Sequence, residues 1–378
     1  MYSFVKNKGL RIFLKTVSWV LIAAAAAIVI FTGAIFWARL VNKSKISIKT
    51  ENGIQEETYV ELGGIEQFIR IRGEDKSNTV ILFLHGGPGS PFGFLSAYFQ
   101  RNLEDAFTFV HWDQRAAGRT FYKNPEYDTS GLSFELLQSD LHELVEYLKN
   151  RFGQEKIVIM GHSWGTVLGS VYSLRHPENV LAYVGVGQVV NGKSGDLAAA
   201  GESAKLAAER GNETDAEKLR EISESYAKTE NLGGLDIPAW TEMRALTAKY
   251  LTPEGQISNT RQLFIGGVSP ELGWEDFKWF LKLGDIEGAF AMQKGLMEYA
   301  VFGFDIYDFS LNYEVPVYFI TGEGDWTTPR AMSEEYFARI TAPDKKYSVI
   351  KNTGHSPMLD NPAAFQDEVR KLLAGYIG

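Results

Sequence analysis

The chain of 378 residues contains no cysteine, and its 6 histidines and 12 prolines are few for this length. Without cysteine there is no disulfide framework, thiolate zinc site, iron–sulfur cluster or catalytic thiol. The histidines are scattered and form no ligand run such as H-E-x-x-H. We therefore expect no metal and no cofactor, and we expect the chemistry to be carried by hydroxyl, imidazole and carboxyl groups.

The chain also lacks an excess of basic residues, because 38 Lys and Arg stand against 47 Asp and Glu, for a formal net charge of -9. A surface of this balance offers no basic face that would neutralise a run of phosphates, which argues against a nucleic-acid partner. Hydrophobic residues make up 45% of the chain and charged residues 22%. This composition excludes a disordered protein and predicts a large buried core.

One long uncharged run, residues 16–38, lies between Lys15 and Arg39. At about 1.5 Å per helical residue it reaches about 35 Å, enough to cross a hydrocarbon layer of about 30 Å. We predict a transmembrane helix at 16–38, preceded by a short tail at 1–15 and followed by a linker at 39–55. The alternative is a secretory signal peptide, whose apolar core is shorter and for which Thr32-Gly33-Ala34 is the only cleavage site.

Orientation in the membrane is not decided by charge, because four basic residues flank the run on each side. They are Lys6, Lys8, Arg11 and Lys15 before it, and Arg39, Lys43, Lys45 and Lys49 after it. The positive-inside count is therefore a tie. From the short N-terminal tail we expect a single-pass protein whose tail is cytoplasmic and whose catalytic part is extracytoplasmic.

From about residue 56, apolar runs of strand length alternate with longer helical patterns, which predicts an α/β core with a mostly parallel sheet and helices on both faces. The expected strands are 58–62, 67–72, 79–84, 108–112, 156–160, 181–186, 315–320 and 347–350. Residues 133–151 form one of the expected helices, with leucines and a valine at helical spacing.

The alternation stops between residues 190 and 311, where helical patterns such as 197–210 and 214–226 replace strands. We expect an inserted helical cap at 190–311, which divides the core into a first part at 56–189 and a second at 312–378. The cap is rich in aromatic residues, among them Trp240, Trp274 and Trp279. We expect most of these rings to pack the cap onto the core.

The motif Gly161-His162-Ser163-Trp164-Gly165 follows the apolar strand that ends at Met160 and precedes a helical run. This is G-x-S-x-G in the strand–turn–helix setting that lifts a serine hydroxyl clear of a sheet. The pentapeptide alone is weak, because a chain of this composition contains one by chance fairly often. Its position between strand and helix makes Ser163 the candidate nucleophile.

A serine nucleophile needs a base and an acid that orients the base, and in this architecture the order along the chain is Ser, Asp or Glu, His. His355 is the histidine well beyond Ser163, in a loop just past the last expected strand. The acid is expected after the preceding strand, where Glu323 and Asp325 both occur. We favour Asp325, with Glu323 as the competitor.

Acyl transfer also needs backbone N–H donors directed at the developing oxyanion. The amide of Trp164, next to the serine, is one candidate. The second is expected in His85-Gly86-Gly87-Pro88-Gly89, directly after the strand at 79–84. We favour Gly87 over Gly86 as donor, and we expect His85 to lock this loop rather than to contact substrate.

Several motifs together resemble the α/β-hydrolase superfamily, and specifically its proline iminopeptidase branch. They are His85 to Gly89, Trp112-Asp113-Gln114-Arg115, Gly161 to Gly165, Gly322 to Asp325 and Gly354-His355. The resemblance implies an α/β-hydrolase fold from about residue 56 onward, with Ser163, Asp325 and His355 as the triad and Gly87 and Trp164 as the oxyanion hole. The reaction that it implies is removal of an N-terminal residue, often proline, from peptides.

In aminopeptidases of this branch, cap glutamates hold the α-amino group of the substrate. The resemblance does not assign these glutamates here, and Glu242, Glu275 and Glu298 are the candidates. We interpret Asp113 and Arg115 as a structural ion pair that supports the site.

Three functions are compatible with these residues. The first is a membrane-anchored serine aminopeptidase, the second a carboxylesterase or lipase-like acylhydrolase with the same triad, and the third a non-catalytic binding module that retains the fold. The expected partners are a peptide or small acyl substrate and a lipid bilayer, with no nucleic acid, and no protein partner is predicted.

Overall fold

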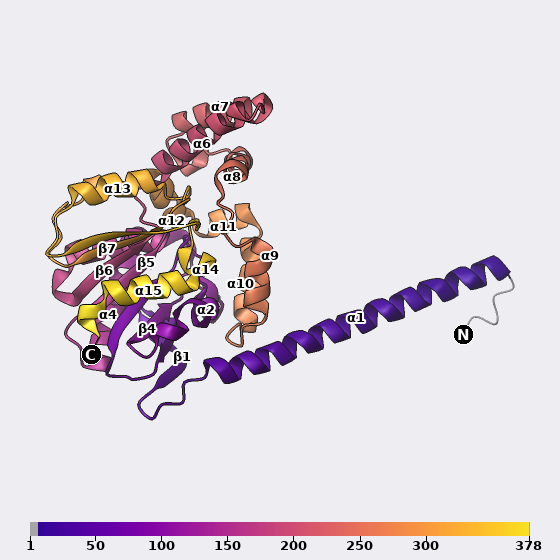
Figure 1. Cartoon of the computed structure of the whole chain (residues 1–378), viewed down its shortest axis with the longest axis horizontal. Coiled ribbons are helices and arrows are strands. Elements are labelled where there is room, and N and C mark those ends of the chain that lie inside the picture. The colour runs from indigo at the N-terminus through magenta and orange to yellow at the C-terminus, as the bar shows by residue number, and fades with distance from the viewer. Residues whose placement is uncertain (1–6, 378) are drawn as a thin grey trace.

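The computed structural model describes residues 7–377, and its centre is one eight-stranded sheet of order β1-β2-β4-β3-β5-β6-β7-β8 (Figure 1). The strands are β1 (Ile54–Leu62), β2 (Ile65–Gly73), β3 (Thr79–Leu84), β4 (Phe107–Trp112), β5 (Ile157–His162), β6 (Val180–Val186), β7 (Val317–Gly322) and β8 (Lys345–Ile350). The pairs β1–β2 and β2–β4 are antiparallel and all other neighbouring pairs are parallel. The predicted mostly parallel sheet is confirmed, and each expected strand overlaps an observed one.

Helices cover both faces of the sheet, as the α/β prediction requires. Alternate strand residues divide between two cores: Leu82 on β3 belongs to the core that contains Leu137 and Val171, whereas Phe83 belongs to the core that contains Phe99 and Phe365. The helices of the two layers are α2 (Ser96–Gln100), α3 (Gly118–Lys123), α4 (Phe134–Phe152), α5 (Trp164–Arg175), α13 (Arg330–Arg339), α14 (Pro357–Asp360) and α15 (Pro362–Leu372). The expected helix at 133–151 is α4, capped at its start by Ser133 and at its end by Gly153 with φ 64°.

A helical insertion, defined here as α6 to α12, connects β6 to β7 and lies at the carboxyl ends of the parallel strands (Figure 1). Its helices are α6 (Gly192–Glu209), α7 (Glu213–Lys228), α8 (Ile237–Leu251), α9 (Asn259–Gly267), α10 (Trp274–Leu283), α11 (Ile286–Met292) and α12 (Lys294–Glu298). Trp279 is buried as expected, but Trp274 is 65% exposed. The expectation concerned most of the aromatic rings of the insertion, and Trp274, on the outer face of α10, is an exception to it.

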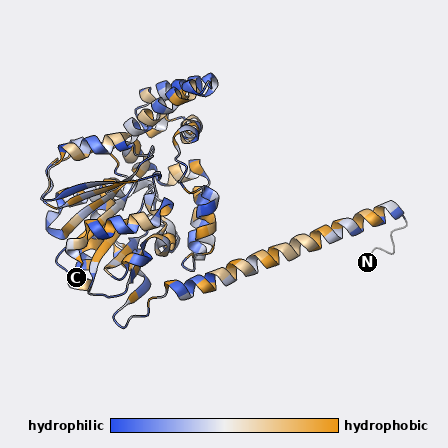
Figure 2. Cartoon of the chain, in the orientation of Figure 1, coloured by the Kyte–Doolittle hydropathy of each residue, from blue (hydrophilic) through white to orange (hydrophobic). Residues whose placement is uncertain are grey.

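Helix α1 (Lys8–Ile46) contains the predicted membrane span and extends beyond it at both ends. It projects away from the rest of the protein and is apolar along most of its length (Figure 2). Among residues 7–377 it is the one helix that is long and apolar enough to cross a membrane, a property that it shares with signal sequences. Residues 1–6 of the predicted N-terminal tail lie outside the described residues.

A buried ion pair joins the first hairpin to the core. Arg115 donates to Asp140 on α4 through Nε and Nη2, each at 2.7 Å, and both side chains are almost fully buried. Gly63, in the β1–β2 turn, has φ 54° and lies against both groups, so that a Cβ here would meet them. Glycine at this position is therefore required by conformation and by space.

We predict that Asp140→Ala lowers the free energy of unfolding by about 3–5 kcal/mol, because it leaves the Arg115 guanidinium buried without its counter-charge. Thermal unfolding of the purified chain in detergent measures the change. The control is Glu135→Ala on the same helix, whose ion pair with Arg175 is exposed and is expected to contribute about 1 kcal/mol or less. Equal effects of the two substitutions would contradict the prediction.

Candidate functional site

Ser163 occupies a strained turn between β5 and α5. Its φ of 53° and ψ of −121° lie in a region that residues other than glycine rarely adopt, at a cost of about 1–3 kcal/mol. The flanking glycines permit the turn, because a Cβ on Gly161 would meet the backbone of Gly165, and a Cβ on Gly165 would meet the Leu84 carbonyl group. This close approach of helix and strand places the Ser163 side chain on the wall of a pocket.

His355 and Asp325 are in direct contact at the ends of β7 and β8. His355 Nδ1 lies 2.9 Å from Asp325 Oδ2 and 3.1 Å from Oδ1. Thr328 donates to the same carboxylate through its backbone N–H at 3.0 Å and its hydroxyl at 2.7 Å. Burial raises the pKa of Asp325, but electrostatic attraction to His355 and the hydrogen bonds from His355 and Thr328 outweigh it and hold the pKa below its usual value.

The competitor Glu323 is held elsewhere. Its backbone N–H donates to the Ile350 carbonyl, and its side chain accepts from the N–H of Asn352 at 3.0 Å. Of the two acids considered from the sequence, the structure brings Asp325 to His355 and leaves Glu323 on the exposed edge of the loop.

Ser163 and His355 both contact the end of β6 or the residue that follows it. The Ser163 N–H donates to the Val186 carbonyl at 3.0 Å, and the next residue, Gly187, lies directly against the His355 ring. His355 Nε2 is buried and has no hydrogen-bond partner among residues 7–377, Ser163 included. With Nδ1 facing the Asp325 carboxylate, the proton sits on Nδ1 and the free Nε2 is the atom that can accept one.

His162 positions the His355 loop from the residue next to Ser163. Its Nε2–H donates to the His355 carbonyl at 3.0 Å, and the two rings lie 4.9 Å apart. Burial, followed by the neighbouring His355, lowers the pKa of His162 to about 3, so its ring is neutral. This hydrogen bond joins the turn at Ser163 to the loop of His355 without involving the Ser163 hydroxyl or the His355 ring.

The two expected oxyanion donors lie on the same pocket wall as Ser163. The Trp164 amide belongs to the first turn of α5, where backbone N–H groups have no partner within the helix and face a developing anion favourably. Gly87 has φ 118°, and a Cβ here would meet the Gly89 and Ser90 amides.

The loop of Gly87 is locked by buried polar contacts. His85 Nδ1–H donates to the Gly86 carbonyl at 2.8 Å, and its Nε2 accepts from the Gln114 N–H at 3.3 Å. Gln114 in turn accepts from the Trp164 indole N–H at 3.1 Å. Burial lowers the pKa of His85 to about 4, so it remains neutral. These contacts are with the protein, as expected for His85.

The prediction that Asp113 pairs with Arg115 is wrong. Arg115 points to Asp140, whereas Asp113 Oδ2 accepts from the backbone N–H of Arg119 at 2.8 Å and so fixes the start of α3. The two side chains are two residues apart in a loop and point to opposite sides of it. Burial, followed by repulsion from Asp276, raises the pKa of Asp113 to about 7.

The pocket beside Ser163 is lined by apolar residues and by a charged pair, Asp196 on α6 and Arg244 on α8. Asp196 also accepts from the Trp240 indole N–H at 2.9 Å. The Arg244 guanidinium lies over the Trp240 and Trp326 rings, at 5.0 and 5.3 Å from their centres. The apolar wall includes Val190, Met297, Val301 and Met332.

None of the three candidate glutamates lines this pocket. Glu242 faces Lys218 at 3.3 Å on the outside of the insertion, Glu275 lies on the outer part of α10 near Lys278, and Glu298 accepts from the Leu232 N–H at 2.8 Å. The carboxylate that does line the pocket is Asp196, which sequence reasoning missed. In the sequence, the indication of this role was that Asp196 lies in the first turns of a helix that follows β6.

Thr328 and Gly187 were also missed. Thr328 follows Asp325 by three residues, the spacing of a turn in which a hydroxyl and an N–H return to an earlier carboxylate. Gly187 follows β6 directly and has φ 59°. A glycine at the end of a strand was the feature of the sequence that indicated a special backbone position here. Among residues 7–377 no group of three or more His, Asp or Glu side chains is placed to hold a metal ion.

Comparison with known proteins places this geometry in context. Residues 79–221 match the alpha/beta hydrolase fold family. The probable aminopeptidase YbaC of Bacillus subtilis is 28% identical over 322 residues, which cover 82% of this chain and 93% of that protein. The proline iminopeptidase of Lactobacillus delbrueckii subsp. lactis is 22% identical over 316 residues, covering 82% of this chain and 95% of the relative.

Among solved structures, a membrane phospholipase A described as a bacterial virulence factor superposes with a TM-score of 0.59 and 15% identity, covering 97% of this chain and 99% of that one. At this identity the likeness concerns the fold. The comparisons confirm the predicted α/β-hydrolase fold and the resemblance to proline iminopeptidases, and they confirm the prediction of an enzyme of the serine hydrolase kind.

We predict that Gly187→Ala lowers kcat by about 10–100-fold, because the added methyl lies against the His355 ring and displaces it, and small misplacements of a reacting group cost about this much. The measurement is kcat on a hydrolysed substrate at saturation. The control is Gly201→Ala on α6, where a Cβ meets open space, so activity is expected to be unchanged. Unchanged kcat in Gly187→Ala, with the fold intact, would contradict the prediction.

Asp113 predicts a pH-dependent stability difference. The folded chain keeps this proton up to about pH 7, whereas an unfolded carboxyl of pKa 3.8 has lost it, so the Asp113 contribution to the free energy of unfolding falls as pH rises between these values. Asp113→Asn keeps the oxygen that accepts from Arg119 and has no charge to bury. The melting temperature of the variant relative to wild type is expected to rise from pH 5 to pH 8. A relative melting temperature that falls or stays constant over this range would be the contrary result.

Proposed function

Because the chain is an α/β-hydrolase similar to proline iminopeptidases, we propose that it is a membrane-anchored serine aminopeptidase that releases N-terminal residues from peptides through an acyl-enzyme. The observation that carries the proposal is the position of the strained Ser163 turn on the wall of a pocket that Thr328 also lines, since Thr328 holds the Asp325 carboxylate that contacts His355. The relatives that cover most of this chain are named for aminopeptidase activity, which supports the substrate class.

In the proposed reaction, Ser163 Oγ attacks the carbonyl carbon of the N-terminal residue while its proton passes to His355 Nε2. Asp325 holds the imidazole with Nδ1 protonated and stabilises the imidazolium that forms. The N–H groups of Gly87 and Trp164 donate to the tetrahedral oxyanion. His355 then gives its proton to the leaving amine, and water, activated by the same imidazole, hydrolyses the ester on Ser163 to return the free hydroxyl.

We assign recognition of the substrate's α-ammonium group to Asp196. It is a carboxylate on the pocket wall and is 8% exposed, so a charge placed beside it is poorly screened. Arg244 balances its charge when the pocket is free of substrate. The apolar wall formed by residues such as Val190 and Met297 suits an apolar or proline side chain at the acyl position.

We further propose that α1 anchors the enzyme as a single-pass membrane protein with an extracytoplasmic catalytic part. The support is the length and hydropathy of α1, which has no buried residue and therefore packs into no protein core. A core helix of the same composition would bury most of its apolar side chains.

A second function is a lipase-like acylhydrolase with the same triad. The observation that favours it is the apolar wall of the pocket. A third, a non-catalytic binding module, requires that Ser163 be unreactive.

A substrate panel separates these functions. The full chain in detergent is expected to hydrolyse aminoacyl-naphthylamides, proline derivatives among them, and to be labelled by a fluorophosphonate probe, with both activities abolished in Ser163→Ala. Cleavage of nitrophenyl esters of fatty acids without any aminoacyl amide cleaved would establish the acylhydrolase instead. Folded wild type that resists the probe would support the binding module.

Asp196→Asn refines the test. It is expected to raise KM for aminoacyl-naphthylamides by about 10-fold or more while changing ester hydrolysis little, because it removes about 1.4 kcal/mol or more of charge pairing with the ammonium group. The matched control is Glu242→Gln, a carboxylate of the insertion outside the pocket, for which KM should not change. Equal loss on amides and esters would assign Asp196 a purely structural role.

A further inference from the structure

Large apolar side chains are exposed on one segment of the helical insertion. Outside α1, most of the exposed large apolar residues among 7–377 lie between residues 263 and 286, the others being Tyr59, Val349 and Ile377. They are Leu263, Phe264, Trp274, Phe277, Phe280, Leu281 and Ile286. A gathering of this kind on one face marks an interaction site.

These residues form outward stripes at helical spacing. On α10, Trp274, Phe277 and Leu281 are spaced i, i+3 and i+7, while Trp279 and Asp276 on the opposite side are buried. On α9, Leu263 and Phe264 face outward while Gly266 packs against Phe94. Each helix therefore packs one face on the protein and exposes large apolar side chains on another face. In an ordinary surface helix the exposed face is polar.

The loop that joins α9 to α10 contacts the end of α1. Asn42 donates to the Val268 carbonyl at 2.9 Å, and Arg39 donates to the Leu272 carbonyl. Arg39 is the first charged residue after the uncharged run of α1. The contact therefore lies at the level where α1 passes from its apolar to its polar part.

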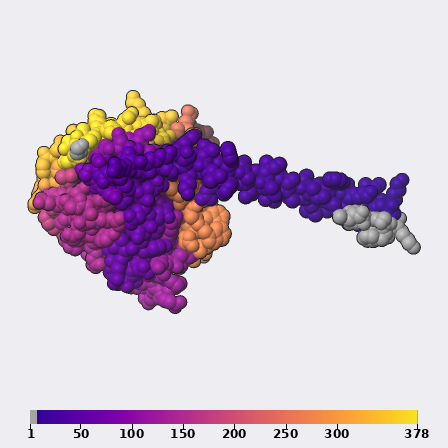
Figure 3. Space-filling view, turned by 90° about the horizontal axis from the view of Figure 1, so that it is seen from below, coloured from indigo at the N-terminus to yellow at the C-terminus, as the bar shows by residue number. Residues whose placement is uncertain are grey.

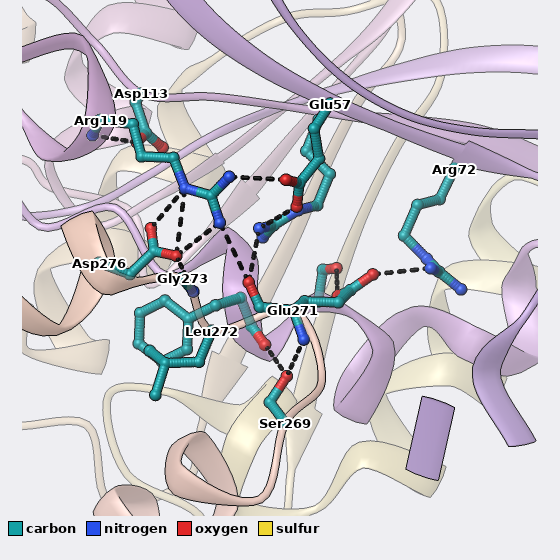
Figure 4. Close-up of polar contacts among 12 residues, drawn as sticks. Glu57, Arg72, Asp113, Arg119, Ser269, Glu271, Leu272, Gly273 and Asp276 are labelled. Atoms are coloured by element: carbon teal, nitrogen blue, oxygen red, sulfur yellow. Dashed lines mark hydrogen bonds and ion pairs between the residues drawn. The ribbon is translucent and has the colours of Figure 1, made fainter. Parts of the chain in front are cut away.

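Buried ionic contacts fix this loop to the core (Figure 4). Glu271 accepts from Arg72 at 2.7 Å through its side chain and from Arg119 at 3.1 Å through its backbone carbonyl, and Arg119 also pairs with Asp276 at 2.7 Å. The charges are mostly buried, so these bonds are shielded from water and hold α9 and α10 in one place relative to the exit of α1.

The two helices lie on the side of the protein from which α1 leaves. In Figure 1, α10 runs across the direction of α1, and in Figure 3 the orange segment protrudes on the same side as α1. A bilayer crossed by α1 therefore has its surface along α9 and α10. Tryptophan, phenylalanine and leucine are the side chains that interfacial helices place on their apolar face.

We propose that α9 and α10 form a second membrane-contacting surface, with Leu263, Phe264, Trp274, Phe277 and Leu281 in the lipid interface beside the point where α1 enters the bilayer. The inference rests on the proposed anchoring by α1. Helices of this kind lie in the plane of the interface with their apolar face about 5–10 Å into the boundary between headgroups and acyl chains.

The same helix reaches the active-site loop from its inner face. Trp279 donates from its indole N–H to the Gly89 carbonyl at 2.9 Å, two residues from the proposed oxyanion donor Gly87. Gln293, which follows α11, donates to the Ala116 carbonyl at 2.5 Å. Helix α10 therefore connects the proposed lipid-contacting face to the loop of Gly87, which lines the pocket.

Charge on this surface is balanced. Basic and acidic side chains occur in equal number along the exposed parts of α9 to α11: Arg261, Lys278 and Lys282 against Glu275, Asp285 and Glu287. Docking is therefore expected to depend on apolar contact and to proceed on neutral phosphatidylcholine without anionic lipid.

Because the chain has no cysteine, single-cysteine variants of the full chain report local environment without background. A fluorophore is attached at Phe277→Cys, and at two controls, Ile28→Cys in α1 and Val349→Cys on β8, whose native side chain is 38% exposed against 40% for Phe277. The proteins are placed in phosphatidylcholine nanodiscs whose lipids carry a spin-label quencher either near the headgroup or deep in the acyl chain.

Position 277 is expected to lose fluorescence mainly to the shallow quencher, position 28 mainly to the deep one, and position 349 to neither. Phe264→Cys, on the neighbouring helix, is a second variant for which the result of position 277 is expected. If positions 264 and 277 behave like 349 while 28 is quenched, the second surface is refuted and the anchor stands. If 28 is not quenched, the anchoring proposal fails and this inference fails with it.

Discussion

The close packing of the first turn of α5 against the ends of β3 and β5 is the constraint on which the site depends. Gly161 and Gly165 leave no room for a side chain between helix and strand, so the chain turns through Ser163 in a conformation that is unfavourable for serine. The surrounding sheet and helix overcome this cost, as strain of this kind requires. The same turn places Ser163 and Trp164 on the wall of one pocket.

Buried polar contacts then join loops that are distant along the chain. His85, Gln114 and Trp164 link the loops after β3, β4 and β5, while His162 and Thr328 hold the His355–Asp325 pair. These groups are neutral or mutually balanced in the low dielectric of the core, so their bonds are strong and their positions defined. The helical insertion completes the pocket with Asp196 and Arg244, and its Trp279 connects α10 to the loop that contains Gly87.

Asp113 shows why pairing of charges is harder to predict than position along a sheet. Opposite charges two residues apart suggested a pair, but in a loop the backbone turns between them, and each found a partner on another element, Arg119 for Asp113 and Asp140 for Arg115. None of the three candidate cap glutamates lines the pocket, for a similar reason. An amphipathic pattern indicates which residues share a helix face, but not which neighbouring element that face contacts. The exposed Trp274 is a further case, because hydrophobicity alone does not tell a buried side chain from an exposed one.

The succession of strands and helices along the chain, the apolar helix α1, and the candidates Ser163, Asp325, His355, Gly87 and Trp164 could all be predicted from the sequence, because each depends on local periodicity or on a motif placed between two elements. The contact of Asp325 rather than Glu323 with His355, the place of Asp196 in the pocket, and the position of α9 and α10 beside the exit of α1 became known from the folded structure. These are contacts between segments far apart in the chain, set by helix packing and buried charge, and the pattern of a single segment contains no information about them.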